Sequence, residues 1–261
     1  MEISFKGKTV LVTGAAGAIG KAIAQDFCAN GGKVFITDIA PAGVEAAVND
    51  LQKIGPCQGL AGDIATESEV IKIVDAAKKA FDGKVDILVN VAGIVGQGKV
   101  EDLTVEAWDK MFAVNCRGSF LLIKHVVPMM KQNKYGKIIN FSSKSGKTGS
   151  ALMCHYSAAK AAIIGLTQAL AYELADFKIN VNCVCPGITE NTGVWSNVSA
   201  GYIQNLNLPR EEVVKKFSEK IPLKRLAAIK DVVAVTSFLG SEGADYMTGQ
   251  AINITGGREM H

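Results

Sequence analysis

A tyrosine and a lysine four residues apart, Tyr156 and Lys160, are the pair in this sequence best suited to acid–base chemistry. In a helix this spacing places both side chains on one face. A positive charge about 5 Å from a phenol, at an effective dielectric of about 20, favours the phenolate by about 3 kcal/mol. We therefore expect Lys160 to lower the pKa of Tyr156 and to make the phenol a proton carrier near neutral pH. The same spacing also arises by chance on many helices, so the elements around the pair must supply further evidence.

A glycine-rich segment, residues 14–20 (GAAGAIG), follows a short apolar run at residues 8–13 that is typical of a buried parallel strand. An apolar helical pattern begins directly after it. A turn of this kind lets bare backbone approach a pyrophosphate, and the N-terminus of the helix supplies free N–H groups. The segment therefore indicates a dinucleotide site, although its spacing is not the GxGxxG fingerprint.

Asp38 follows a second expected strand, residues 33–37, and no arginine or lysine lies in the glycine turn or directly after Asp38. A carboxylate at this place accepts hydrogen bonds from ribose hydroxyls and repels a 2′-phosphate. We therefore expect NAD rather than NADP. Asp38 could instead cap the following helix, but its position after the second strand of a glycine-turn unit favours cofactor recognition.

Strands and helices alternate along the rest of the chain. Strands are expected at residues 58–61, 87–89, 137–141, 179–184 and 251–254. Helices are expected at residues 43–53, 67–81, 104–131, 210–218 and 231–239, with one more that carries Tyr156 and continues to residue 175. This alternation predicts right-handed βαβ units and an α/β fold with one doubly wound, Rossmann-like parallel sheet covered by helices on both faces. Ligands of such sheets bind beyond the carboxyl ends of the strands, where Gly14, Asp38, Asp63 and Asn90 fall.

Two further segments bear on a site. Asn115 lies among apolar residues, so its amide must be satisfied by hydrogen bonds; a bond to core backbone and a functional role both stay open. Residues 189–220 show little periodicity before residue 210, which predicts a substrate lid or binding loop at about 189–220.

Composition limits the classes of function. The 261 residues, with 48% hydrophobic and 20% charged side chains, predict one domain over residues 1–261. A net charge of +3 with scattered lysines gives no support for a nucleic-acid or acidic-membrane partner. Without a signal-like N-terminus or a long apolar run, a cytoplasmic protein with no membrane partner is expected. The six cysteines show no metal-binding spacing, so we expect reduced thiols and no metal.

Together these residues resemble the short-chain dehydrogenase/reductase family over essentially the whole chain. The landmarks, in order, are Thr13 and Gly14 through Gly20, Asp63, Asn90 to Gly93 (NVAG), Asn115, Ser143, Tyr156, Lys160, Pro186 with Gly187, and a glycine-containing segment at residues 249–257. Ser143 lies 13 residues before Tyr156, the interval that such enzymes show, so it is preferred over Ser142. Two positions depart from the family pattern: Ala18 stands where glycine is usual, with the extra glycine at Gly17, and Val91 follows Asn90 in place of a second asparagine.

The resemblance implies a role for each catalytic landmark. Tyr156 would pass a proton to or from the substrate oxygen, and Ser143 would hydrogen-bond and orient that oxygen. Lys160 would lower the pKa of the tyrosine and bond the nicotinamide ribose, and Asn115 would hold a water that relays protons from Lys160. The implied cofactor is NAD, and its expected contacts are Gly14, Gly17, Ala18, Ile19, Gly20, Asp38, Asp63, Ile64, Asn90, Ala92, Gly93, Tyr156, Lys160, Pro186, Gly187 and Thr189. The family is commonly tetrameric, so a homotetramer is expected.

The substrate class also follows from resemblance. The segments SSKSGKTGS, GLTQALA, IPLKR and TGQAINITGG look like those of polyol dehydrogenases in the family, including enzymes that act on sorbitol 6-phosphate. We expect NAD-dependent interconversion of a secondary alcohol on a polyol or polyol phosphate and its ketose. The candidate substrate contacts are Ser143, Ser145, His155, Tyr156, Trp195 and Asn197, and His155 has a helix-surface or interface position as its alternative. A substrate phosphate could meet Lys147, Arg210 or Lys215.

Four alternative functions stay open. Three are enzymes: a 3-oxoacyl carrier-protein reductase, an acetoin or butanediol dehydrogenase, and a hydroxysteroid dehydrogenase. The first should prefer NADPH, against Asp38, and the last should have a more apolar lid. The fourth is a non-catalytic dinucleotide-binding protein, against which the intact Ser143, Tyr156 and Lys160 argue.

Overall fold

The computed structural model describes residues 3–193, 195 and 209–261 of this chain. The strands of these residues form one parallel sheet in the order β3-β2-β1-β4-β5-β6-β7. They are β1 (Thr9–Thr13), β2 (Lys33–Thr37), β3 (Cys57–Gly59), β4 (Ile87–Asn90), β5 (Gly136–Phe141), β6 (Ile179–Pro186) and β7 (Ala251–Ile254). The chain reverses its direction of travel across the sheet between β1 and β4, which is where open α/β sheets bind ligands. The predicted doubly wound α/β fold is confirmed.

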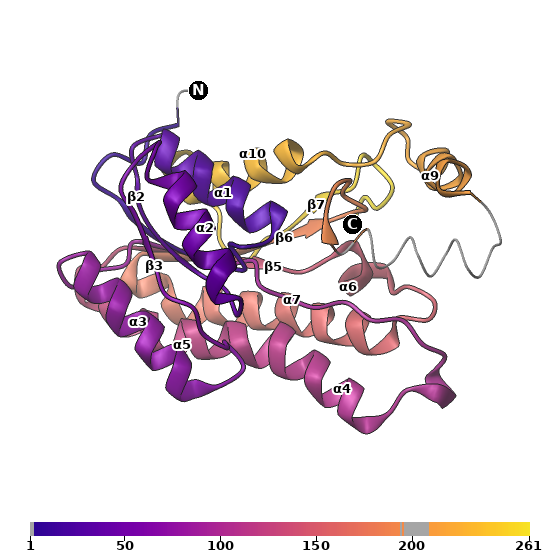
Figure 1. Cartoon of the computed structure of the whole chain (residues 1–261), viewed down its shortest axis with the longest axis horizontal. Helices are drawn as coiled ribbons and strands as arrows, with labels where there is room; N and C mark the ends of the chain where they lie inside the picture. The colour runs from indigo at the N-terminus through magenta and orange to yellow at the C-terminus, as the bar shows by residue number, and fades with distance from the viewer. Residues whose placement is uncertain (1–2, 194, 196–208) are drawn as a thin grey trace.

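Helices cover both faces of the sheet (Figure 1). One face carries α1 (Ala18–Ala29), α2 (Pro41–Leu51) and α10 (Ile229–Gly240), and the other carries α3 (Glu67–Ala80), α5 (Gly118–Asn133) and α7 (Cys154–Leu174). Three more helices are α4 (Val105–Phe112), α6 (Lys144–Thr148) and α9 (Arg210–Ser218). Within residues 3–193, 195 and 209–261, none of the helices combines the length and the hydropathy that a membrane span requires.

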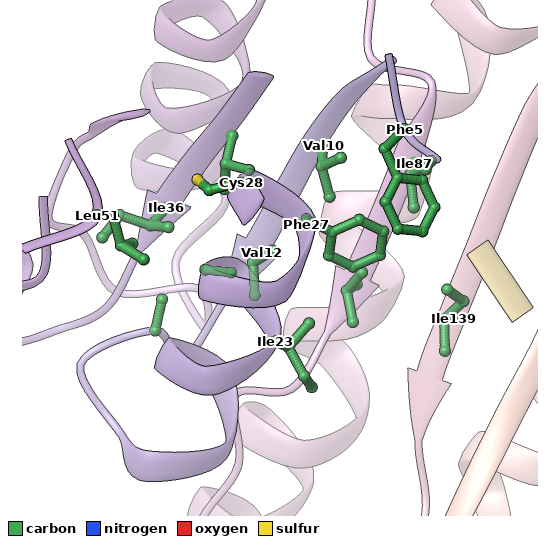
Figure 2. Packing of buried hydrophobic residues seen from close by; sticks show 14 of the residues in the cluster. Phe5, Val10, Val12, Ile23, Phe27, Cys28, Ile36, Leu51, Ile87 and Ile139 are labelled. Atoms are coloured by element: carbon green, nitrogen blue, oxygen red, sulfur yellow. The ribbon is translucent and has the colours of Figure 1, made fainter. Parts of the chain in front are cut away.

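The strands consist of nearly continuous apolar residues because helices cover both faces of the sheet. All five residues of β1 are buried, as expected for a central strand of a parallel sheet. Figure 2 shows Ile23 and Phe27 of α1 lying against Val10 and Val12 of β1. The ring of Phe5 packs on that of Phe27, with their centroids 4.4 Å apart. This packing holds α1, and with it the glycine turn at its N-terminus, against the sheet.

Most predicted elements lie within two residues of the observed bounds, and the expected helical stretch at residues 104–131 is helical but not α-helical throughout. It is divided into α4, a π-helical turn at Ala113–Arg117 and α5, which ends at Asn133. A π turn widens the helix by one residue and often occurs at functional sites. Here it contains Asn115, whose side chain is buried.

We predict that Phe27→Ala lowers the free energy of unfolding by about 3–5 kcal/mol, because it removes a fully buried ring and leaves a cavity between α1 and the sheet. Urea unfolding followed by circular dichroism measures the change. Ile71→Ala on α3 is the control, since Ile71 is 41% exposed and should cost less than about 1 kcal/mol. A similar small loss for both variants would contradict this account of the core.

Candidate active site

The glycine turn after β1 lies directly against the segment that follows β4. A Cβ atom on Gly14, whose φ is +67°, would lie 2.8 Å from the Cα of Ala92. A Cβ atom on Gly20 would clash with the Gly14 carbonyl oxygen. The Ala92 amide donates to the Thr13 hydroxyl over 3.0 Å, which ties the two segments together. These approaches leave no room for a side chain at Gly14 or Gly20.

The same turn leaves the N-terminus of α1 available to an anion. The helix begins at Ala18 and its N-cap is Gly17, which has no side chain to cap the first N–H groups. Those groups have no partner within the helix and carry the positive end of its dipole. The methyl group of Ala18, where the family usually has glycine, lies in this first turn. The geometry therefore fits a dinucleotide pyrophosphate at this turn.

Asp38 lies beside the glycine turn at the end of β2. Its Oδ2 accepts a hydrogen bond from the Ala16 amide over 3.0 Å, and its Oδ1 accepts one from the Ala40 amide over 3.3 Å. The carboxylate therefore stabilises the glycine turn. It also binds the amide of Ala40, the residue before α2, so the alternative role of Asp38 at the start of this helix is partly observed. None of the ion pairs among the described residues involves Asp38.

Asn115 brings the π turn, the end of β4 and Lys160 together. Its Oδ1 accepts from the Ile94 amide over 2.8 Å, and its Nδ2 donates to the Ile94 carbonyl over 2.9 Å. A Cβ atom on Gly93 would lie 2.6 Å from Asn115 Oδ1 and 3.3 Å from Lys160 Nζ. The backbone-bonded alternative for this amide is therefore observed, and the water relay implied by the resemblance stays a prediction.

Tyr156 and Lys160 share one face of α7, as their spacing predicted. Lys160 Nζ lies 5.9 Å from the centroid of the Tyr156 ring and donates to the Phe141 carbonyl over 2.8 Å. Burial lowers the pKa of Lys160 to about 8, so the ammonium is charged at neutral pH.

The pKa of Tyr156 differs from our expectation. Burial raises it, and a hydrogen bond with Ser143 opposes part of that rise. The expected lowering by Lys160 was wrong for this structure, because burial has the largest effect on the phenol and raises its pKa.

The two serines after β5 have different positions. Ser142 is buried and its hydroxyl donates to the Lys160 carbonyl over 2.7 Å, so it holds α7 against the sheet. Ser143 lines a cavity and caps α6, with its Oγ accepting from the Ser145 amide over 3.1 Å. Both serines line the cavity, but only Ser143 is hydrogen-bonded to Tyr156, so Ser143 stays the preferred candidate.

A cavity of about 370 Å³ lies over these residues, within the range of small-molecule sites. One wall is formed by the start of α1, by the segment after β4, and by the end of β6 with the segment that follows it; it contains Ile19, Val91, Gly93, Ile94, Pro186, Gly187, Ile188 and Thr189. Ser143, Tyr156 and Lys160 also line it. The remaining wall contains Lys144, Ser145, Gly149, Ser150, Ala151, Met153, Thr192, Trp195, Phe217 and Arg258, with Phe141 and Ser142 beneath.

Some predicted contacts lie elsewhere. His155 is 2% exposed and does not line the cavity; its Nε2 faces Gly96, where a Cβ atom would lie 2.9 Å away. Both sequence interpretations of His155 were therefore wrong, because α7 turns this ring into the protein, away from the side that carries Tyr156. Asn90 is also buried, and its Nδ2 donates to Asn140 Oδ1 over 2.9 Å, so its side chain does not line the cavity.

Of the other predicted contacts, Asp63 and Ile64 do not line the cavity. Asp63 accepts from the Ala65 amide over 2.9 Å, and Ile64 is buried beneath Gly118 of α5. Ser145 and Trp195 line the cavity as expected, whereas Asn197 lies outside the described residues.

Of the residues predicted to bind a substrate phosphate, Lys147 and Lys215 are not among those that line the cavity. Lys147 donates to the Ala251 carbonyl over 2.6 Å, Lys215 is exposed on α9, and the side chain of Arg210 lies outside what is described. Lys144 and Arg258 line the cavity instead. The position of Lys144 directly after Ser143 was a usable sequence signal, whereas Arg258 has no local signal because only the fold returns the C-terminal segment to α6 (Figure 1).

Comparison with known proteins agrees with this site. A family model described as enoyl-(acyl carrier protein) reductase matches residues 14–259. An uncharacterised oxidoreductase of Thermotoga maritima is 40% identical, with 98% of both chains covered. A sorbitol dehydrogenase of Cereibacter sphaeroides is 34% identical and covers 97% of this chain and 98% of its own.

Two solved structures extend the comparison. An NAD⁺-bound xylitol dehydrogenase has a TM-score of 0.92 at 29% identity, with 97% of this chain and 99% of its own covered. A variant of actinorhodin polyketide ketoreductase with NADPH has a TM-score of 0.93 at 32% identity, with 97% and 98% covered. The chain belongs to the short-chain dehydrogenase/reductase family of oxidoreductases, whose fold binds a nicotinamide dinucleotide.

Proposed function

We propose that this protein is an NAD-dependent dehydrogenase that interconverts a secondary alcohol of a polyol, or polyol phosphate, and its ketose. The observation that carries the proposal is one cavity that joins Tyr156, Ser143 and Lys160 to a wall with several hydroxyl groups, those of Ser145, Ser150 and Thr192. Such a wall suits a substrate with many hydroxyls. The sorbitol and xylitol dehydrogenases among the similar proteins support this substrate class.

The residues present fit the nicotinamide dinucleotide. Its pyrophosphate fits the glycine turn, where Gly14 and Gly20 leave space for no side chain. Asp38 would bond the ribose hydroxyls, which favours NAD over NADP. The remaining contacts of the cofactor would be Gly17, Ala18, Ile19, Asp63, Ile64, Asn90, Ala92, Gly93, Tyr156, Lys160, Pro186, Gly187 and Thr189. When bound, this cofactor supplies the hydride acceptor or donor.

The chain's own residues then handle the proton. In alcohol oxidation, the Tyr156 phenolate accepts the proton of the substrate hydroxyl, and in ketone reduction the phenol returns it. Ser143 hydrogen-bonds the same oxygen and orients it. The hydrogen bond with Ser143 lowers the pKa of Tyr156 and so favours the phenolate, while Lys160, whose Nζ lies 5.9 Å from the centroid of the Tyr156 ring, would bond the nicotinamide ribose. Asn115 keeps Gly93 and Ile94 in place beside Lys160, which makes it a positioning residue.

A second candidate function has one observation in its favour. The ketoreductase with NADPH has a TM-score as high as that of the xylitol dehydrogenase, so reduction of an acyl chain with NADPH is the alternative. The Asp38 carboxylate beside the glycine turn argues for NAD and against a 2′-phosphate.

The surroundings of the cavity support a substrate lid. Trp195 and Phe217 come from either end of the expected lid at about 189–220, and both line the cavity. Their rings meet edge to face with centroids 6.0 Å apart. The homotetramer, the cytoplasmic location and the single catalytic domain over residues 1–261 stay predictions.

We predict that purified protein oxidises sugar alcohols with NAD⁺ at least about tenfold more efficiently than with NADP⁺, because Asp38 repels the 2′-phosphate. Absorbance at 340 nm measures turnover across alditols, alditol phosphates, short diols, 3-hydroxyacyl thioesters and hydroxysteroids. Turnover of thioesters with NADP⁺ and none of alditols would instead establish the second candidate. Tight NADH binding without turnover of any alcohol would establish the non-catalytic alternative.

We predict that Tyr156→Phe lowers kcat at least about 100-fold, because the ring remains but the proton carrier is lost. The dissociation constant of NADH, measured by fluorescence, should change little. Tyr172→Phe is the matched control, since Tyr172 lies on the same helix and is 89% exposed. If the Tyr156→Phe enzyme kept half of its turnover, another group would have to carry the proton.

The pH dependence should differ between the two directions. Because burial raises the pKa of Tyr156, the phenol holds its proton at neutral pH and must lose it to act as a base. We predict that kcat/KM for alcohol oxidation rises between pH 6 and pH 8 and that kcat/KM for ketose reduction does not. Initial rates in buffers of constant ionic strength measure both. An oxidation rate independent of pH over this range would contradict the raised pKa.

A further inference from the structure

Two cations of the cavity wall have no role in the chemistry proposed above. Lys144 is the first residue of α6, directly after Ser143, and Arg258 lies in the segment that follows β7. Both line the cavity. Only 16% of the Lys144 side chain and 24% of the Arg258 side chain are exposed. They come from distant parts of the sequence and converge on one wall.

Their charges are incompletely compensated among the described residues. Glu259 is the acid nearest to both: its Oε1 lies 3.4 Å from Arg258 Nε and 3.9 Å from Lys144 Nζ. One carboxylate therefore faces two cations. Arg258 Nη1 is buried and has no hydrogen-bond partner within the described part of the chain. A cation kept out of water without full pairing is costly, so the arrangement is better suited to a protein that receives an anion.

The neighbouring groups orient the two cations. The Arg258 guanidinium lies 6.0 Å from the centroid of the Phe217 ring, which also lines the cavity, and such a ring attracts a cation over its face. Lys144 Nζ donates to Ser150 Oγ over 3.2 Å, and Ser150 Oγ shares a 2.8 Å hydrogen bond with Ser145 Oγ. The wall thus continues from the two cations into a chain of hydroxyls.

We propose that the substrate carries an anionic group, a phosphate or a carboxylate, and that Arg258 and Lys144 bind it while Ser143 and Tyr156 hold the reacting oxygen. This proposal rests on the function proposed above and narrows its substrate class to acidic polyols. Arg258 offers the planar fork of donors that phosphate and carboxylate groups accept. Lys144 adds a second charge one residue from Ser143, so a single short substrate reaches both ends of the site.

Two alternative roles for Lys144 and Arg258 fit their contacts less well. The cations could serve only to neutralise Glu259, but both approach the same oxygen, Oε1, and one negative charge leaves one of the two positive charges uncompensated. They could bind a phosphate of the cofactor, but the pyrophosphate fits the glycine turn after β1, whereas these residues come from α6 and the segment after β7. Burial and the nearby Arg258 both lower the pKa of Lys144, so they disfavour its charged form. A bound anion would stabilise that charged form.

The test measures binding separately from turnover. Isothermal titration of the enzyme–NADH complex uses erythritol, ribitol and sorbitol, each beside its terminal phosphate and the aldonate of equal length. At least one anionic compound should bind about tenfold to a hundredfold more tightly than its neutral match. The phosphate and aldonate series show which anion is preferred. Oxidation of the same compounds with NAD⁺ is followed at 340 nm.

Four variants locate the effect. Arg258→Gln and Lys144→Gln should each remove most of the preference for the anion, while affinity for the neutral alditol changes less than about threefold. Arg258→Lys should retain part of the preference. Lys216→Gln, which removes an exposed charge from α9, should retain all of it. Thermal unfolding of each variant shows whether it is folded.

The outcomes separate this proposal from the function on which it rests. Arg258-dependent binding of anions without any oxidation would keep the anion subsite and overturn the polyol dehydrogenase. Oxidation of neutral alditols with no tighter binding of any anion would keep the dehydrogenase and overturn the subsite. A preference that survives in both Gln variants, or a matching loss of NADH affinity in Arg258→Gln, would also overturn it.

Discussion

The close approach of bare backbone between the ends of β1 and β4 is the constraint on which the site depends. Gly14 and Gly20 have no side chains, so the turn after β1 contacts Ala92 and leaves the N-terminus of α1 open. The burial of Phe27 and Ile23 against β1 holds that helix in place. Cofactor binding in this family therefore follows from packing that excludes side chains, together with a helix end that receives negative charge.

Desolvation connects this scaffold to the chemistry. Tyr156 and Lys160 are both buried, and burial shifts their pKa values in opposite directions, upward for the phenol and downward for the ammonium. The Asn115 amide keeps the chain after β4 next to Lys160 through its two bonds to Ile94. A polar amide at the π turn thus fixes the backbone beside Lys160, and its bonds show why an asparagine can occupy an otherwise apolar stretch.

The sequence predicted the parts of the site that depend on local pattern. Alternating apolar runs located the strands, and glycine spacing and a helical repeat located the turn and the Tyr156–Lys160 face. It could not predict features that depend on tertiary contact. The π turn at Asn115 accompanies bonds to a residue 21 positions away. The inward direction of His155, the burial that raises the Tyr156 pKa and the return of Arg258 to α6 all require the assembled sheet.

The wall formed by Lys144 and Arg258 joins two parts of the chain that are synthesised at different times. The glycine turn and the ends of β1 and β4 leave the ribosome early, and Tyr156 follows more than 100 residues before Arg258. β7 must pair with β6 before the segment after it can reach α6. The substrate cavity therefore has its charged wall only once β7 has joined the sheet, because the segment after β7 brings Arg258 to α6.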